Sequence, residues 1–190
     1  PSYYEKRGGF LIAAAIRQHI FVSVNRSFST ELQVKYSEFE KVHNIEDLKH
    51  PLVREAIKKL GISPKNLEIS SQADIPSGTG LGSSGTFGVA LIHALSEYAQ
   101  LNLSPREVAE AACDIEINVL GEPSGKQDQY ASAFGGLNTY TFSNDGHVDV
   151  EPLRLSPENM ANFQDSLLMF FTGFTRRSSS ILQEQKTKSE

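Results

Sequence analysis

The 190-residue sequence contains no tryptophan, a single cysteine and no long apolar run. With only Cys113 present, a disulfide framework within the chain is excluded, and its place in the apolar-periodic run AEAACDIEI indicates a small buried residue rather than a reactive thiol. The longest apolar stretch, residues 10–16, is too short to span a bilayer and predicts a strand. No signal peptide is found, so we expect a cytoplasmic protein without a membrane partner.

The sequence also lacks a basic stripe. Its 18 lysines and arginines are scattered among 23 aspartates and glutamates, for a formal charge of −5, and the densest basic clusters are the pairs Lys58-Lys59 and Arg176-Arg177. Binding of a phosphate backbone needs a basic stripe, so nucleic acid is not an expected partner. The 39% hydrophobic and 22% charged residues are typical of an ordinary soluble globular protein.

Periodicity and turn residues predict an α+β arrangement. Two apolar runs, residues 9–16 and 19–25, are predicted to form adjacent antiparallel strands because only the polar pair Arg17-Gln18 separates them. Further strands are predicted at residues 31–36, 67–71, 137–142 and 147–151, with a buried strand at 166–172; residues 38–50 look irregular. Helices are predicted at residues 51–60, 83–100, 104–120 and briefly 129–134, with another opened by the serines at 178–180.

The segment PSGTGLGSSG, residues 76–85, joins a predicted strand to a long predicted helix. Backbone N–H groups and the helix N-terminus converge there, which favours anion binding. Glycines let the backbone approach a phosphate closely, and the hydroxyls of Ser83 and Ser84 can bond phosphate oxygens or a metal ion. A capped flexible turn would explain one or two of these glycines, but explains four glycines with two serines poorly.

Two nucleotide-binding patterns can be compared with this loop. Gly80, Gly82 and Gly85 formally satisfy G-x-G-x-x-G, but a dinucleotide site also needs a second parallel strand that ends in an acidic residue about 20 positions on. Here a second helix follows, and the nearest acidic candidate, Glu107, lies inside it. A Walker loop needs Gly-Lys-Ser/Thr after the glycines, which is missing. A nucleotide loop of another kind remains.

The string PSGTGLGSSGTF resembles the second signature of the GHMP kinases, the family of galactokinase and the homoserine, mevalonate and phosphomevalonate kinases. Residues 76–84 match it throughout. Gly85 stands where the family usually has alanine, a loss of one methyl group that we expect to be tolerated although it weakens the start of the helix. The resemblance implies that ATP is bound by Pro76, Gly78, Gly80, Leu81, Gly82, Ser83, Ser84 and Gly85.

Two carboxylates follow the loop, Glu116 on the second helix and Asp128 in a polar loop. Phosphoryl transfer needs neutralisation of phosphate charge and a group that orients or deprotonates the attacking hydroxyl. In the GHMP kinases a helix Glu followed by Gly-x-x-Asp-Gln serves these roles. The resemblance therefore implies that Glu116 and Ser84 hold Mg²⁺ and that Asp128 is catalytic. Lys126 either helps to neutralise charge during catalysis or is an ordinary solvated lysine.

Three longer strings, SYYEKRGGFLIAAAI, GEPSGKQDQYASAFGGLNTY and TGFTRRSSSILQEQ, resemble the glycero-manno-heptose 7-phosphate kinases and related fucokinase-type sugar kinases. This resemblance implies a sugar phosphate substrate, with the anomeric hydroxyl of heptose 7-phosphate converted to the 1,7-bisphosphate. Gly135 and Gly136 would let the backbone pass close to the sugar. Arg176 and Arg177 would bind the second phosphate, or belong to an ordinary capped surface helix.

The resemblance also implies a domain organisation. Residues 1–155 would form a ribosomal-protein S5 domain 2-like domain without its first strand, and residues 156–190 the beginning of a ferredoxin-like C-terminal domain. We expect the family's first signature before Pro1 and its third after Glu190. The alternatives are another GHMP substrate such as fucose or galactose, a non-catalytic module that binds a nucleotide or sugar phosphate, and an NAD-dependent oxidoreductase. A homodimer is left open.

Overall fold

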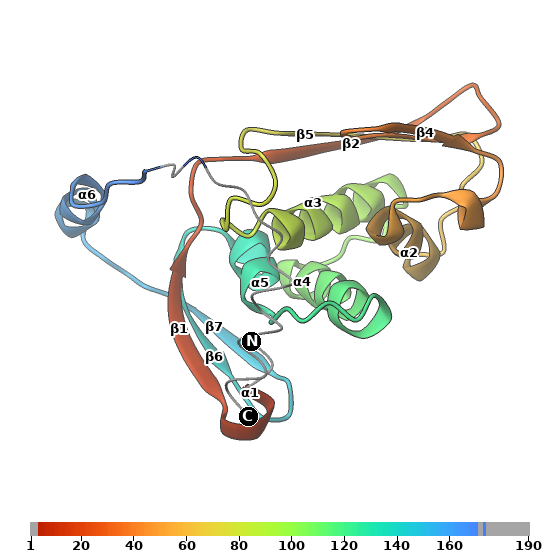
Figure 1. The fold of residues 1–190 in the computed structure, drawn as a ribbon. Coiled ribbons are helices and arrows are strands. Elements are labelled where there is room, and N and C mark those ends of the chain that lie inside the picture. Colours follow the sequence, from red (N-terminus) through yellow and green to blue (C-terminus); the bar gives the residue numbers. More distant parts are fainter. Residues whose placement is uncertain (1–3, 171–172, 174–190) are drawn as a thin grey trace.

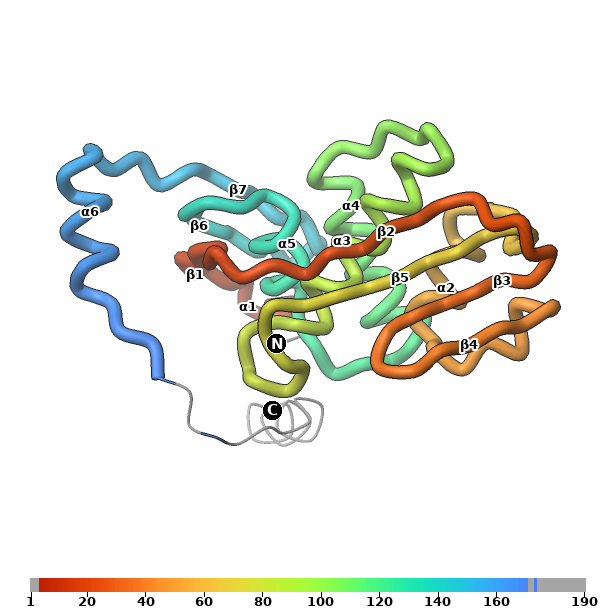
Figure 2. Tube along the Cα trace, turned by 90° about the horizontal axis from the view of Figure 1, so that it is seen from above, coloured from red at the N-terminus to blue at the C-terminus, as the bar shows by residue number. Residues whose placement is uncertain are grey.

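A computed structural model describes residues 4–170 and 173 of the protein. In these residues two sheets lie on opposite sides of a layer of helices, which makes the fold α+β as predicted (Figure 1). The larger sheet has the strand order β2-β5-β3-β4 and the smaller sheet the order β1-β6-β7. Seen from above, the larger sheet lies over α2 and α3 (Figure 2).

The strands are β1 (Gly9–Ala14), β2 (Ile20–Arg26), β3 (Leu32–Lys35), β4 (Phe39–Val42), β5 (Leu67–Ala73), β6 (Leu137–Phe142) and β7 (Val148–Pro152). The α-helices are α1 (Tyr4–Arg7), α2 (Pro51–Lys59), α3 (Ser83–Tyr98), α4 (Pro105–Cys113), α5 (Gln127–Phe134) and α6 (Pro157–Asp165). Two segments wind differently, the 3₁₀ turn η1 (Ile45–Asp47) and the π-helical segment η2 (Asp114–Val119).

The predicted pairing of the first two strands is wrong. β1 pairs with β6, from Gly9 opposite Phe142 to Ala14 opposite Leu137, whereas β2 pairs with β5 in the other sheet. Residues 15–19 therefore cross from one sheet to the other instead of forming a hairpin. The physical reason is that the inward-facing side chains of β1 and β2 pack against different hydrophobic cores.

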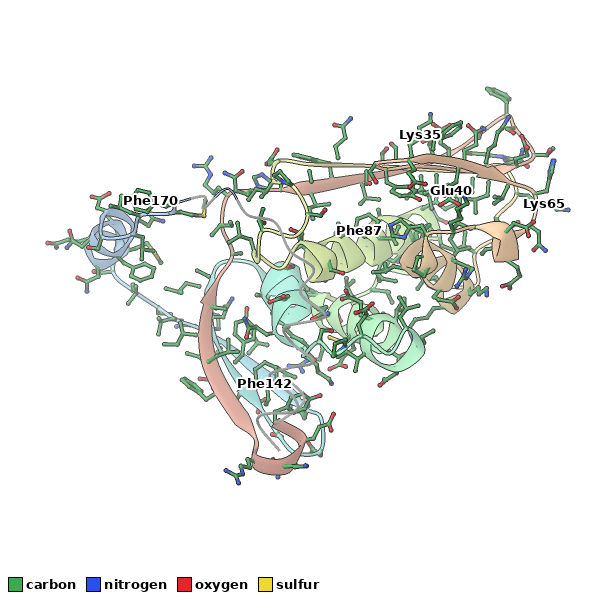
Figure 3. The ribbon with its side chains drawn as sticks, viewed as in Figure 1. Lys35, Glu40, Lys65, Phe87, Phe142 and Phe170 are labelled. Carbon is green, nitrogen blue, oxygen red and sulfur yellow. The ribbon has the colours of Figure 1, made fainter. Side chains whose placement is uncertain are left out.

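The two cores hold the helical layer from both sides. The larger core lies between the four-stranded sheet and helices α2, α3 and α4, where Leu91, Ile92 and Leu95 of α3 are fully buried. The smaller core packs the three-stranded sheet against α4 and α5, with Tyr130 and Tyr140 at its centre. Figure 3 shows Phe87 beneath the larger sheet and Phe142 on the smaller one. Helices α3, α4 and α5 are thus fixed relative to one another.

The helix predicted at residues 104–120 is divided. Its first part, α4, begins at Ser104 with the predicted capping box to Glu107. Its second part is η2, in which the N–H of Leu120 donates to the carbonyl of Ile115 at 2.9 Å, five residues earlier. A π-helical turn inserts one residue and changes the direction of the side chains around it, often at functional sites. Glu116 lies in this turn.

The structure also differs from the prediction in three other segments. Strand β4 and the turn η1 lie in a stretch expected to be irregular, and residues 167–170 form no strand where a buried strand was predicted. The helix expected after the serines at 178–180 lies outside the described residues. No helix in the described part of the chain is both long enough and apolar enough to cross a bilayer.

Cys113 provides a test of the smaller core. Its side chain is 2% exposed, and burial raises the pKa of the thiol above its ordinary value. We expect no reaction with a chromogenic disulfide reagent in native buffer and full reaction after denaturation, because the thiolate is the reactive form. Rapid labelling of the native protein would contradict this packing of α4.

Candidate functional site

The glycine loop forms one wall of a cavity of about 580 Å³. Gly80, Leu81, Gly82 and Ser83 line the cavity at the start of α3. Gly82 is the N-cap residue of α3, with φ +72°, and no side chain caps the first turn of the helix. The N–H groups of that turn and the positive end of the helix dipole are therefore available to an anion in the cavity.

The structure brings Ser84 and Glu116 together, as expected from the resemblance. The hydroxyl of Ser84 donates to Oε1 of Glu116 at 2.5 Å, and the amide of Gln129 donates to Oε2 at 2.5 Å. Glu116 is only 4% exposed, and this burial raises its pKa above the ordinary value against the opposite effect of the two hydrogen bonds. One buried carboxylate thus links α3, η2 and α5.

Asp128 lies on the first turn of α5, directly beside the glycine loop. A Cβ atom built on Gly82 would lie 3.0 Å from Cγ of Asp128, so loop and carboxyl are in contact. Asp128 also lines the cavity. Its pKa is raised because the surrounding protein removes water from the carboxyl group. A carboxylate with a raised pKa is a better proton acceptor for a hydroxyl group in the cavity.

The remaining wall of the cavity combines polar and apolar groups. Thr86 and Ser132 share a hydrogen bond at 2.7 Å between their hydroxyls. Residues 13–16, which lead out of β1, contribute mostly small apolar side chains. Further cavity residues are Gln18, His19, Ile20, Ile75, Val89, Ala90, His93, Gln127 and Ala131. The cavity can therefore hold a small molecule that has both hydroxyl groups and apolar surface.

Lys126 is not brought to the glycine loop. Its ammonium group donates to the carbonyl of Gly146 at 2.8 Å and pairs with Glu110 at 3.2 Å, which ties the β6–β7 turn to α4. Glu110 also accepts a hydrogen bond from the hydroxyl of Tyr130. The ammonium group of Lys126 is therefore engaged in this network rather than at the glycine loop.

The other expected substrate residues lie at different distances from the cavity. Gly135 and Gly136 end α5, both with positive φ, and the carbonyl of Gly136 accepts from the N–H of Ala15 at 2.8 Å. Ala15 lines the cavity, so this glycine pair lies immediately behind its wall.

Arg176 and Arg177 lie outside the described residues. Pro76 and Gly78 begin the glycine loop, upstream of its cavity-lining part.

Sequence reasoning missed several residues of this site. Gln129, 1% exposed, was not assigned a role although it holds Glu116. Ser132 was also missed, and its spacing from Asp128 on α5 could have indicated a shared helix face. Thr86 follows Ser83 at the same kind of spacing on α3.

The residues present fit Mg²⁺. Ser84 and Glu116 offer hard oxygen ligands, which Mg²⁺ prefers, and a cation would offset the cost of the buried carboxylate charge. In the described part of the chain no cluster of three or more His, Cys, Asp or Glu side chains could hold a metal ion. Mg²⁺ is usually bound by one or two carboxylates together with substrate phosphates and water.

Replacing Gln129 tests the link between the three helices. Gln129→Ala should lower the free energy of unfolding by about 1–3 kcal/mol because it removes a donor from a buried carboxylate. Urea denaturation measures the change. Gln127→Ala is the matched control, since Gln127 lies on the same turn of α5 but is exposed. Equal stability of the two variants would contradict the role given to Gln129.

Comparison with known proteins places this geometry in a family. Residues 50–136 match the family model of the GHMP kinases N terminal domain. The D-glycero-alpha-D-manno-heptose 7-phosphate kinase of Campylobacter jejuni is 30% identical over an alignment that covers 98% of this chain and 58% of that protein. A galactokinase of Thermosipho africanus is 31% identical, over 77% of this chain and 44% of that protein.

A crystal structure described as a D-glycero-D-manno-heptose 1-phosphate kinase from Bacteroides thetaiotaomicron superposes with a TM-score of 0.75. It is 29% identical in sequence, and the match covers 81% of this chain and 54% of the other. The chain thus spans about half the length of the proteins that it matches. Sequence and fold agree, and the chain contains the GHMP kinases N terminal domain.

Proposed function

We propose that the protein containing this chain transfers a phosphoryl group from ATP to a hydroxyl group of a sugar or sugar phosphate. The observation that carries the proposal is the convergence of Asp128 and the Ser84–Glu116 pair on the first turn of α3. A phosphate-binding helix end, a metal-ligand pair and a proton acceptor are the parts that phosphoryl transfer needs.

Each part has a separate task in this proposal. The N–H groups at the start of α3 bind and orient the ATP phosphates, and Ser84 and Glu116 hold Mg²⁺ beside them. Mg²⁺, when bound, neutralises charge on the phosphates during transfer. Asp128 orients the substrate hydroxyl in the cavity and accepts its proton.

The proposed substrate is a heptose phosphate. The names of the C. jejuni and B. thetaiotaomicron relatives agree on a heptose phosphate and differ in the position of the phosphate. We propose the anomeric hydroxyl of D-glycero-D-manno-heptose 7-phosphate as the acceptor, which gives the 1,7-bisphosphate. In this proposal Gly135 and Gly136 shape the wall beside the sugar, and Arg176 and Arg177 bind its second phosphate.

The proposal also includes the domain organisation of the enzyme and its location in the cell. Residues 1–155 act as the nucleotide-binding domain, and residues 156–190 begin a second domain that completes the enzyme. The protein works in the cytoplasm, where ATP and sugar phosphates are available. The length of the relatives, of which this chain spans about half, supports a larger enzyme.

The role of Asp128 is tested by Asp128→Asn in the full-length protein. We expect kcat to fall about 100-fold or more, because the amide cannot accept the proton, while ATP binding remains. Steady-state kinetics measures the first effect and equilibrium dialysis with ATP the second. An amide variant with near wild-type turnover would refute the assigned role.

The substrate is tested by coupled ADP-release assays with heptose 7-phosphate, fucose, galactose and mevalonate. We expect the highest kcat/KM for heptose 7-phosphate, at least about tenfold above the others, because a site with hydrogen-bonding groups and a phosphate-binding group rejects analogues that lack them. A preference for galactose or fucose would replace the substrate but keep the reaction. ATP binding without turnover of any sugar would instead indicate a non-catalytic binding module.

A further inference from the structure

Gly85 is a glycine at a position where the backbone conformation does not require one. It lies on the first turn of α3 and is buried, with no positive φ, so its backbone conformation is open to any residue. Glycine in a helix is less stable than alanine. Glycine here therefore needs an explanation other than backbone conformation.

The explanation lies in the contact between α3 and α5. A Cβ atom on Gly85 would lie 2.9 Å from Cβ of Asp128, and 3.3 Å from both the backbone N and the side-chain Cδ of Gln129. Contacts between real Cβ atoms are not this short. A Cβ atom and a backbone nitrogen cannot rotate away as the end of a side chain can. Adding one methyl group at residue 85 must therefore move α5, α3 or both.

Both neighbours of Gly85 belong to the candidate site. Asp128 has its carboxyl group against Gly82 of the loop, and Gln129 holds the buried carboxylate of Glu116. A displacement of the first turn of α5 would thus change the distance from Asp128 to the loop and the hydrogen bond to Glu116 together. The single missing methyl group determines how closely these groups approach.

We propose that Gly85 is a positioning residue, which sets the distance between the proton acceptor Asp128 and the phosphate-binding turn of α3. Its effect on catalysis rests on the proposed function, whereas its effect on geometry does not. The sequence indicated only that the loss of the methyl group would be tolerated at this position. Because α5 packs directly on residue 85, we infer that alanine would not be accommodated in this chain without a shift of the helices.

Gly88 provides a matched control on the same helix. It is also buried, but a Cβ atom there would meet Cβ of Ala112 at 3.6 Å and a side-chain oxygen of Glu116 at 3.8 Å, which are ordinary contact distances. Gly88→Ala makes the same chemical change without forcing the helices apart. It should keep wild-type kcat and raise the melting temperature slightly, as alanine favours the helix.

The experiment compares Gly85→Ala and Gly88→Ala in the full-length protein by steady-state kinetics. For Gly85→Ala we expect kcat to fall about tenfold or more, because small displacements of reacting groups reduce the rate strongly. KM for ATP should stay within about threefold, since the N–H groups of the loop remain in place. A kcat within twofold of wild type, or an equal loss in Gly88→Ala, overturns the proposal.

Crystal structures of the two variants separate this inference from the proposed function. If the wild-type protein transfers no phosphate, the proposed function fails, and the structures alone decide on Gly85. A shift of Asp128 away from Gly82 in Gly85→Ala, but not in Gly88→Ala, supports the positioning role. Superposable positions of Asp128 in both variants overturn it.

A variant that folds poorly is also informative. The double variant Gly85→Ala with Asp128→Gly removes the Cβ atom of residue 128 that the new methyl group would meet. Adding Gly85→Ala to the Asp128→Gly variant should lower the melting temperature by less than adding Gly85→Ala to the wild-type protein does. Equal decreases in the two backgrounds would show that this contact is not the cause.

Discussion

The site depends on the close approach of the first turns of α3 and α5. Gly82 and Gly85 leave no side chain between these helices, so Asp128 lies against the loop that begins α3. The same approach brings Gln129 to the buried carboxylate of Glu116. Without it, the phosphate-binding turn, the Ser84–Glu116 pair and Asp128 would each exist, but would not lie together at the start of α3.

This approach is held by the rest of the fold. The larger core fixes α3 beneath the four-stranded sheet, and the smaller core fixes α4 and α5 on the three-stranded sheet. The π-helical turn at the end of α4 contains Glu116, and the Lys126–Glu110 pair ties the neighbouring β-turn to α4. Lys126 thus supports the framework of the site, and Glu116 gives a buried charge that favours a bound cation.

The sequence predicted those helix ends that are determined by residues close by in the chain. Pro51 and Gly61 delimited α2, and Ser104 with Glu107 marked the start of α4, because capping depends on neighbouring residues. The pairing of β1 with β6 could not be predicted in this way, since it depends on which core each strand packs against. The π-helical turn at Glu116 likewise has no signature in the apolar pattern.

For the candidate site, too, the sequence predicted some features and not others. The loop glycines indicated anion binding on physical grounds, whereas the joint roles of Ser84, Glu116 and Asp128 came from the family resemblance. The structure brings these three residues together, but it places Lys126 in another network. The contact between Gly85 and Asp128 joins residues far apart in the chain, so only the packing of the helices reveals it.

Calorimetric titration of the full-length protein with ATP and with NAD, each with and without Mg²⁺, tests whether the glycine loop and Glu116 form a site for ATP and Mg²⁺. We expect that ATP binds, that Mg²⁺ strengthens this binding in the wild-type protein but not in Glu116→Gln, and that NAD does not bind. Binding of NAD, or ATP binding that is independent of Mg²⁺, would contradict the assignment of the glycine loop and Glu116.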